Sequence, residues 1–492
     1  MNKLIPTQMI RLQSEIIRFS LPTFFLMSLN AALLTYEIGL VSRLGTESLA
    51  GFTLCLPLVF LMGMMSAGGL GGGVASAVAR ATKDQRYQHQ LIRTSITLAW
   101  IFGVFFAVLL GWDPFQWIGR MAGDVGIANR AREYAVIFFA AIPLLWVTNV
   151  LANIHRAIGN PRAPAIVGAV TIVVQGGVSY PLILGWGNVA GFGLQGAAWI
   201  SALGFLVQAL WLSVELIRTL DKTNQASKAR QRSHVAECYF PILSIQVLKL
   251  SSSLSKYLLV LPKLNVRKQN LSDILWVGLP SSVNTLMAAL TSVFVTVYVS
   301  KLGGIELAAY GVASRLESLL IPIIFSIGMS QVALVGKAWG LGETQRARDL
   351  VYAGAILSFT LTTVLGVGVT LVPVEWLRWM ADSADVSSMM QSYLQIAAPC
   401  IGLLGLGLAF SFSCQGIKRP SAAFIAALVR LLLVWTALNV WNPSSLFGVA
   451  WISSASLLVF AVVVVVASGP FSPFTLKSTK LHTLSETKEA WS

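Results

Sequence analysis

The chain has 492 residues, of which 55% are hydrophobic and only 11% are charged. Soluble domains carry about 25% charged residues, so this composition excludes an ordinary soluble protein and indicates an integral membrane protein. The net charge of +15 could suggest a nucleic-acid partner, but the basic residues gather in loops between apolar segments, as membrane topology predicts. We therefore expect a lipid bilayer around the chain and no nucleic-acid partner.

Twelve apolar segments are each long enough to cross the roughly 30 Å hydrocarbon core of a bilayer as a helix. They cover residues 20–42, 50–79, 92–112, 134–154, 163–186, 192–216, 271–300, 309–336, 350–372, 391–416, 421–441 and 446–468. The first segment is too long for a signal peptide, so we expect it to be retained. Alternating strand segments of about ten residues are not visible. The sequence therefore predicts an all-α integral membrane protein.

Most of the 35 lysines and arginines lie on one side of the predicted spans. They are found at the N-terminus, after the second, fourth, eighth and tenth spans, in the segment 218–270 and in the tail. Basic loops are retained in the cytoplasm during membrane insertion. We therefore predict that both termini and the central segment are cytoplasmic, and we expect the chain in the bacterial inner membrane.

The second half of the chain repeats the first. The matching positions are Pro22 with Pro280, Leu44-Gly45 with Leu302-Gly303, Gly71 with Gly328, Arg156–Pro161 with Gln415–Pro420, and Gly196–Ser201 with Gly448–Ser453. Each copy contains six spans, an even number, so both copies have the same orientation in the membrane. This pattern predicts two six-helix bundles related by a pseudo-two-fold axis along the membrane normal.

The repeat and the loop composition together predict four parts. They are an N-terminal lobe at 15–217, a cytoplasmic loop between the lobes at 218–270, a C-terminal lobe at 271–468 and a cytoplasmic tail at 469–492. The later part of the loop mixes apolar residues with lysines, a pattern that fits an amphipathic helix on the membrane surface.

Glu37 is a carboxylic acid inside the first apolar span. A carboxylate at membrane depth costs several kcal/mol unless it is neutralised or faces a wet cavity, so Glu37 is a candidate functional group. Apolar surroundings favour the neutral form of a carboxyl, which allows Glu37 to take up and release a proton. The alternative is that Glu37 lies near the outer end of the span, about 10 Å from Leu44, and only reaches water.

Other polar side chains inside the spans of the first half could line a wet cavity beside Glu37. These candidates are Asn30, Tyr36, Asn149, Asn153, Gln175, Ser179 and Tyr180. Each of them could instead form a hydrogen bond between helices. The second half has fewer such groups, so we expect the coupling site in the first half.

The second half contains three charged residues within its spans, Arg315, Glu317 and Arg430. Arg315 is two residues from Glu317, so the two side chains do not share a helix face. A pair between Glu317 and Arg430 on different helices would let both remain charged. A structural pair, snorkelling to the interface and a transport role all remain open.

The remaining motifs exclude several other chemistries. The glycine run at 68–73 lacks the Lys-Ser/Thr of a phosphate-binding loop, so we expect close helix packing or a flexible point there. Pro143, Pro322 and Pro399 are expected to kink their spans. The cysteines and histidines show no metal-ligand spacing, and there is no nucleotide motif or catalytic constellation. We therefore expect no metal site, no bound cofactor and no enzymatic activity.

The order, spacing and duplication of the motifs resemble the MATE (multidrug and toxic compound extrusion) family of secondary transporters. The segments that carry the resemblance are LPTFF…VSRLGTESLAGF, RAIGNPRAP, LPSSVNTL…VSKLGGIELAAYGVASRLESL and VGKAWGLGETQRAR. The resemblance implies twelve helices in two lobes. It also implies export of amphipathic, often cationic, compounds in exchange for protons or sodium.

The resemblance also bears on single residues. Glu37 matches the acidic position of the first helix in the family, and Gln175 falls where many members have an amide in the fifth helix. Ser179 departs from the pattern, because a family-like segment would have Asp there. The seventh span lacks the carboxylate of some sodium-coupled members. A single carboxyl group favours a proton over a sodium ion, which needs several oxygen ligands.

These observations predict a cation-coupled antiporter, with the proton favoured over sodium, that exports small amphipathic organic cations by alternating access. We expect Glu37 to bind the coupling cation and the protein to work as a monomer. The alternative is a flippase for lipids or lipid-linked oligosaccharides with a similar architecture. Such a flippase would need a more strongly cationic cavity than Arg315 and Arg430 supply.

Overall fold

The computed structural model describes residues 6–112, 118, 124–187, 189–232, 267–371 and 383–471. Within these ranges the regular structure is helical except for one short antiparallel ladder. Its strands are β1 (Gly185–Trp186) and β2 (Val189–Ala190), with Gly185 opposite Ala190 and Trp186 opposite Val189. The predicted amphipathic part of the central loop and the predicted tail beyond Phe471 lie outside the described residues.

The helices follow the apolar segments closely. In the first half they are α1 (Pro6–Val41), α2 (Thr46–Met64), α3 (Gly71–Arg80), α4 (Gln85–Gly111), α6 (Val125–Ala140), α7 (Ile142–Ala157), α8 (Arg162–Leu184) and α9 (Gly193–Arg232). In the second half they are α11 (Lys268–Val299), α12 (Gly304–Ser318), α13 (Ile321–Gly340), α14 (Thr344–Thr370), α16 (Ala384–Gly416), α17 (Ser421–Trp441) and α18 (Leu446–Ala467). A π-helical turn at Met65–Leu70 joins α2 to α3. Helix α9 extends well into the predicted central loop.

The described helices include 11 that are long and apolar enough to cross a membrane, and up to 12 if α6 and α7 form one span. This confirms the predicted all-α membrane class. Helices α6 and α7 meet at a 49° bend. The bend falls at Ala141, next to Pro143, whose ring removes a backbone donor from the helix. The expected kink at Pro143 is therefore confirmed.

The chain divides into two compact units that do not coincide with the two sequence halves. Unit 1 consists of Met1–Phe24, Gly68–Gln88 and Ser272–Ser492, and unit 2 consists of Phe25–Ala67 and His89–Leu271. Unit 1 thus adds two segments of the first half to the second half. The boundary between unit 2 and unit 1 in the second span falls between Ala67 and Gly68, inside the π-helical turn. The division into lobes at 15–217 and 271–468 remains a prediction.

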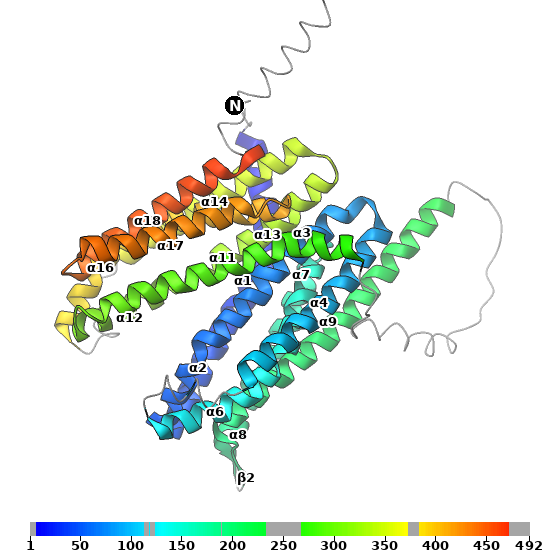
Figure 1. Ribbon diagram of the computed structural model, residues 1–492. Coiled ribbons are helices and arrows are strands. Elements are labelled where there is room, and N and C mark those ends of the chain that lie inside the picture. The colour runs from blue at the N-terminus through cyan, green and yellow to red at the C-terminus, as the bar shows by residue number, and fades with distance from the viewer. Residues whose placement is uncertain are drawn as a thin grey trace, which may run out of the picture. The chain divides into compact units, whose positions relative to one another are not determined.

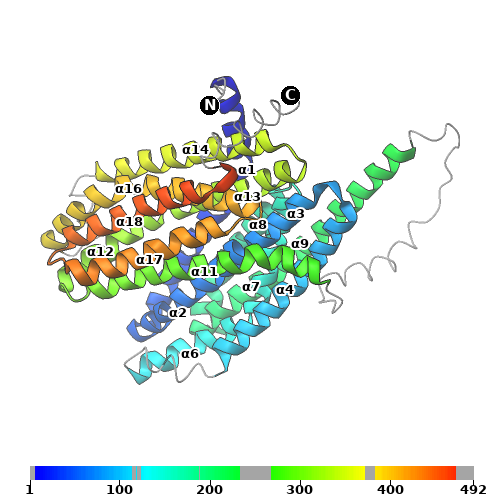
Figure 2. The same ribbon diagram turned by 45° about the horizontal axis from the view of Figure 1, so that its top comes forward.

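In unit 1, α14 and α18 pack against α16, α13 packs against α14 and α16, and α17 packs against α18. Figures 1 and 2 both show α14, α16, α17 and α18 lying side by side. The core between these helices contains Leu350, Phe410, Phe460 and Val464, each buried. Helix α3 from the first half packs against α13 and α16, and its residues from Gly71 to Ala79 are all buried.

In unit 2, α6 packs against α2 and α9, α7 packs against α9, and α8 packs against α9. Gly51 of α2 permits a close approach to α6, because a Cβ there would lie 2.7 Å from the backbone nitrogen of Ala131. The buried ring of Trp146 stacks on Phe102 and Phe106, with ring centroids 5.8 and 5.3 Å away. Each such aromatic pair contributes about 0.5–1.5 kcal/mol beyond area burial.

The sequence repeat reappears in the turns that join the helices. Gly45 and Gly303 both stand before the second helix of their half with a positive φ, +106° and +155°. Asn160 donates its backbone N–H to His155 O, and Arg419 donates to Cys414 O, both at 2.9 Å. These bonds close the same type of helix-terminating turn in both halves.

One residue of this turn differs between the copies. Gly159 has a φ of +92°, and Lys418 occupies the matching position with a φ of +64°. Glycine adopts this left-handed conformation without a Cβ clash, whereas another L-residue pays about 1–2 kcal/mol. Lys418 therefore stands where the backbone favours glycine.

The glycine run at 68–73 serves close helix packing, as expected. A Cβ at Gly69 would lie 2.9 Å from Ser282 Cα, and a Cβ at Gly73 would lie 2.6 Å from Ile274 O and 2.7 Å from Gly278 N. The π-helical turn overlaps the start of the same run. The run therefore lets α3 lie against the backbone of α11.

We expect Gly73→Ala to destabilise the protein by about 1–3 kcal/mol, because the added methyl group must push apart two backbones. The thermal unfolding midpoint in detergent measures this effect. Gly39→Ala is the matched control, since a Cβ at Gly39 in α1 meets nothing within 4 Å. Equal midpoints for the two variants would contradict the close approach of α3 and α11.

Candidate functional site

Glu37 lies on the buried face of α1. Its side chain is 6% exposed, and Leu40 and Val41, three and four residues further along the helix, are buried with it. Residues at this spacing share one face of an α-helix. The sequence also allowed Glu37 to lie at the end of its span and reach water. The low exposure of Glu37 does not support that alternative.

Ser179 of α8 is the hydrogen-bond partner of Glu37. Its Oγ lies 3.4 Å from Glu37 Oε1 and 2.7 Å from the backbone oxygen of Gln175. A serine hydroxyl has one proton to donate and two lone pairs that accept. The single proton cannot serve both oxygens, and the shorter distance favours Gln175 O as its acceptor. The Ser179 oxygen is then an acceptor facing Glu37, and a protonated Glu37 carboxyl can donate to it.

Tyr134 of α6 lies near Glu37 and is bound to Ser201 of α9. Tyr134 is 3% exposed, its hydroxyl forms a hydrogen bond with Ser201, and it lies within electrostatic range of Glu37. Its ring packs edge-to-face on Phe52, with 5.0 Å between the ring centroids. Sequence reasoning missed both residues. Tyr134 stood at the edge of its predicted span, and Ser201 carried no signal of its own.

Gln175, Asn149 and Asn153 bind backbone or side chains of unit 2. Gln175 Nε2 donates to Ile200 O at 3.0 Å. Asn149 Nδ2 donates to Ser66 Oγ at 2.7 Å, and Asn153 Nδ2 donates to Ala67 O at 3.0 Å. The two asparagines thus hold the π-helical turn of the second span. The sequence left open whether these residues line a cavity or form hydrogen bonds between helices. In the structure their amide groups form hydrogen bonds between helices.

Three other cavity candidates, Asn30, Tyr36 and Tyr180, are exposed in unit 2. Asn30 Nδ2 donates to Leu26 O within α1. Tyr36 directly precedes Glu37 and Tyr180 directly follows Ser179, so both side chains leave the helix on a different face from the buried pair. A role for these three residues in contacting substrate remains a prediction.

Two of the three charged residues that the sequence places within the spans of the second half, Glu317 and Arg430, lie near each other in unit 1. Glu317 accepts a hydrogen bond from Tyr393 of α16 and lies within electrostatic range of Arg430 of α17. The Arg430 Nε donates to Ser456 Oγ at 3.4 Å, and its guanidinium lies 6.0 Å from the centroid of the Phe460 ring. Arg315 is exposed. Glu317 and Arg430 therefore lie within electrostatic range of each other, and the ion pair between them that the sequence suggested remains a prediction.

Glu317 also lies at a break in its span. Helix α12 ends at Ser318, and α13 begins at Ile321 with Pro322 in its first turn. Proline at this position starts a helix because its missing N–H is not needed there. The break confirms that Pro322 interrupts the regular helix of this span.

Comparison with known proteins gives a consistent result. The MatE family model matches residues 20–180 and 280–441, one match in each half of the chain. The chain is 23% identical to the probable multidrug resistance protein YoeA of Bacillus subtilis, over 65% of this chain and 63% of that relative. It is 20% identical to an FAD transporter of Shewanella oneidensis over 80% of each chain. It is 22% identical to the multidrug export protein MepA of Staphylococcus haemolyticus over 90% of each chain.

Solved structures show the same fold. The chain superposes on a MATE structure in the bent conformation with a TM-score of 0.77, at 21% identity over 98% of this chain and 99% of that one. It superposes on an outward-facing multidrug resistance MATE transporter of the MOP superfamily with the same TM-score, at 22% identity over 93% and 95%. Since the family model matches both halves and most of their spans, the chain belongs to the MatE family of multidrug and toxic compound extrusion transporters.

Proposed function

We propose that the chain is a proton-coupled antiporter that exports small amphipathic organic cations by alternating access. Protonation of Glu37 on the outer side and its deprotonation on the cytoplasmic side couple export to the proton gradient. We further propose that the chain works as a monomer in the bacterial inner membrane with both termini in the cytoplasm. The arrangement of Glu37 with Ser179 is the observation that carries the coupling.

The hydrogen-bond inventory around Glu37 favours a proton. A protonated carboxyl donates to Ser179 Oγ while the serine donates to Gln175 O, so every proton has an acceptor. A charged carboxylate would have to compete with Gln175 O for the single serine proton. A buried charge without good partners is costly, so loss of the proton favours an arrangement that admits water or a cationic substrate. The protonated and charged forms of Glu37 therefore favour different arrangements of the protein, and coupling requires such a difference.

The substrate class rests on the family and on the buried acid. Relatives named as multidrug proteins support export of varied amphipathic compounds, and a carboxylate at Glu37 favours cations among them. The relative named as an FAD transporter shows that one fold carries unlike substrates. The flippase alternative is not favoured, because Arg430 is already engaged by Ser456, Phe460 and Glu317 and is not offered to a pyrophosphate.

Purified protein in proteoliposomes tests this function with ethidium as the cationic probe. Proton and sodium gradients are imposed separately, each with the membrane potential clamped. We expect ethidium transport with the proton gradient and only background transport with the sodium gradient. Transport with sodium alone would reassign the coupling ion. Transport with neither gradient, for ethidium and for a panel of unlike organic cations, would refute the proposed function.

A further inference from the structure

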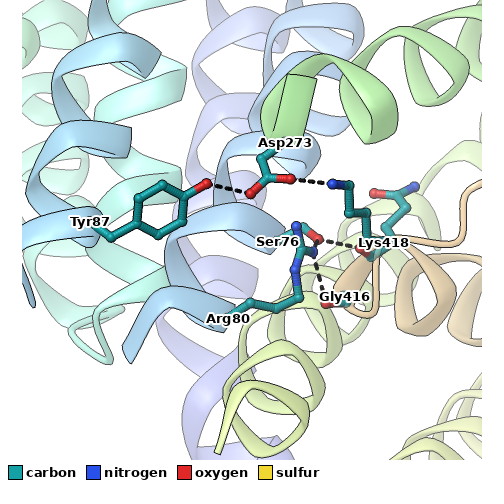
Figure 3. A network of polar contacts seen from close by, with 7 residues as sticks. Ser76, Arg80, Tyr87, Asp273, Gly416 and Lys418 are labelled. Atoms are coloured by element: carbon teal, nitrogen blue, oxygen red, sulfur yellow. Dashed lines mark hydrogen bonds and ion pairs between the residues drawn. The ribbon is translucent and has the colours of Figure 1, made fainter. Parts of the chain in front are cut away.

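Asp273, at the start of α11, connects segments from both halves of the chain. Its carboxylate accepts a hydrogen bond from the Tyr87 hydroxyl of α4 and forms an ion pair with Lys418, which follows α16. Figure 3 shows Asp273 between Tyr87 and Lys418, with one carboxylate oxygen directed at each. All three residues belong to unit 1. Tyr87 is the only one of the three that comes from the first half of the sequence.

A second set of bonds reaches the same turn from α3. Arg80 donates to the backbone oxygen of Gly416 at 3.2 Å and to the Ser76 hydroxyl, and Ser76 donates to the backbone oxygen of Gln415. Gln415 and Gly416 end α16 and lead directly into Lys418. The end of α3 therefore binds the α16–α17 turn directly. The start of α4 binds Asp273, which is the ion-pair partner of Lys418 in that turn.

The repeat places a counterpart of Asp273 in the first half. Glu15 stands seven residues before Pro22, just as Asp273 stands seven residues before Pro280. Glu15 of α1 forms an ion pair with Arg346 at the start of α14, with 3.0 Å between Oε1 and Nη2. Each half thus uses an acid near the start of its first predicted span to bind the start of the helix that forms the third predicted span of the other half, which is α4 or α14. All four segments lie in unit 1.

The backbone of Lys418 gives an independent reason to assign a role to its side chain. Lys418 has a φ of +64°, in the position where the first half has Gly159. A left-handed non-glycine residue persists when the surrounding structure compensates its strain. The ion pair with Asp273 supplies that compensation. A residue needed only to make the turn would be glycine, as in the first copy.

We propose that the network of Asp273, Lys418, Tyr87, Arg80 and Ser76, together with its counterpart pair Glu15 and Arg346, forms a latch that holds the cytoplasmic ends of the two halves together. The latch closes the path from the cytoplasm, and it must break before substrate enters from that side. The cytoplasmic position follows from the basic loops on this side of the spans. The inference rests on the proposed alternating access, but the latch itself is measured without transport.

The rate at which a thiol reagent reaches a cysteine in α3 measures how often the latch opens. Val78 of α3 is fully buried, and its replacement by the smaller cysteine gives a thiol that reagents reach only when α3 separates from its neighbours. The background has Cys55, Cys238, Cys400 and Cys414 replaced by alanine. Everted membrane vesicles expose the cytoplasmic face, and the rate of maleimide labelling at residue 78 is measured. Lys418→Gly and Asp273→Asn are compared with the unmodified latch.

We expect either variant to raise the labelling rate about tenfold or more, since each loses a charge-assisted hydrogen bond of the closed state. Lys418→Gly is the sharper variant, because glycine also removes the backbone strain and so preserves the fold. Glu133→Gln is the matched control. It removes a carboxylate from an exposed ion pair with Arg130 in unit 2 and should leave the labelling rate unchanged. An unchanged rate in Lys418→Gly would overturn the latch.

A trapping experiment provides a second test. Cysteines at positions 15 and 346, joined by a short bis-maleimide, fix the counterpart contact in its closed form, and mass spectrometry verifies the cross-link. We expect ethidium transport to stop in the cross-linked protein and to continue in both single-cysteine variants. Continued transport by fully cross-linked protein would overturn the latch. Absence of gradient-driven transport in the unmodified protein would instead refute the proposed function and leave the labelling result standing.

Discussion

Glu37→Gln is expected to abolish proton-driven export while leaving the protein folded. Glutamine has nearly the same shape as a protonated glutamic acid, and its amide can donate to Ser179 Oγ as the acid would. It cannot lose a proton, so the step in which Glu37 becomes charged and favours the other arrangement no longer occurs. Ethidium transport in proteoliposomes with an imposed proton gradient should fall to the level of empty liposomes.

Two measurements separate this loss from simple misfolding. The thermal unfolding midpoint of Glu37→Gln should equal that of the unmodified protein or exceed it, because the neutral side chain avoids a buried charge. Glu37→Asp is the matched control, since it keeps the titratable group one methylene further from Ser179. It should retain proton-driven export at a reduced rate. Full export by Glu37→Gln under the same gradient would show that coupling depends on another group.

The class, the spans and the repeated turns could be predicted from sequence because each depends on short stretches of chain. An apolar run of about twenty residues crosses a bilayer as a helix whatever its neighbours are. The matched motifs marked the positions where the two halves form alike turns, and the structure shows a positive φ there at Gly45, Gly303, Gly159 and Lys418. The bend at Pro143 followed from the missing N–H of proline in the same local way.

The partners of polar residues could not be predicted, because they depend on how each helix is rotated and on which helices meet. Asn149 and Gln175 looked like equal cavity candidates, yet Asn149 binds the π-helical turn through Ser66 and Gln175 binds Ile200 O. Tyr134 reaches the surroundings of Glu37 from α6, which no sequence spacing connects to α1.

The position of Asp273 was available from the sequence, but its role was not. The repeat alignment pairs Asp273 with Glu15, so two acids at matching positions could have been noticed. Tyr87, Lys418 and Arg80 are separated from Asp273 by long stretches of chain and are brought to it only by packing. The boundaries of unit 1 and unit 2 could not be predicted for the same reason. Residues 1–24 and 68–88 of the first half belong to unit 1 because they contact the second half, and no division of the chain at a single loop predicts this.

Arg430→Leu is expected to destabilise the folded protein by about 3 kcal/mol, because it removes the cation within electrostatic range of Glu317 inside the helix bundle. Leucine also gives up the bond to Ser456 and the contact with the Phe460 ring. The thermal unfolding midpoint in detergent measures the loss. The double variant Glu317→Gln with Arg430→Leu should recover most of it, since both charges are then absent.

The double-mutant cycle distinguishes the structural pair from a transport role for these residues. A structural pair predicts that the two single variants are each less stable than the double variant, with a coupling energy of about 0.5–3 kcal/mol. It also predicts that the double variant exports ethidium, because the coupling group Glu37 lies in unit 2. If the single and double variants all unfold at the same midpoint as the unmodified protein but fail to export, Glu317 and Arg430 act in transport. In that case a second ionisable site in the second half would work alongside Glu37.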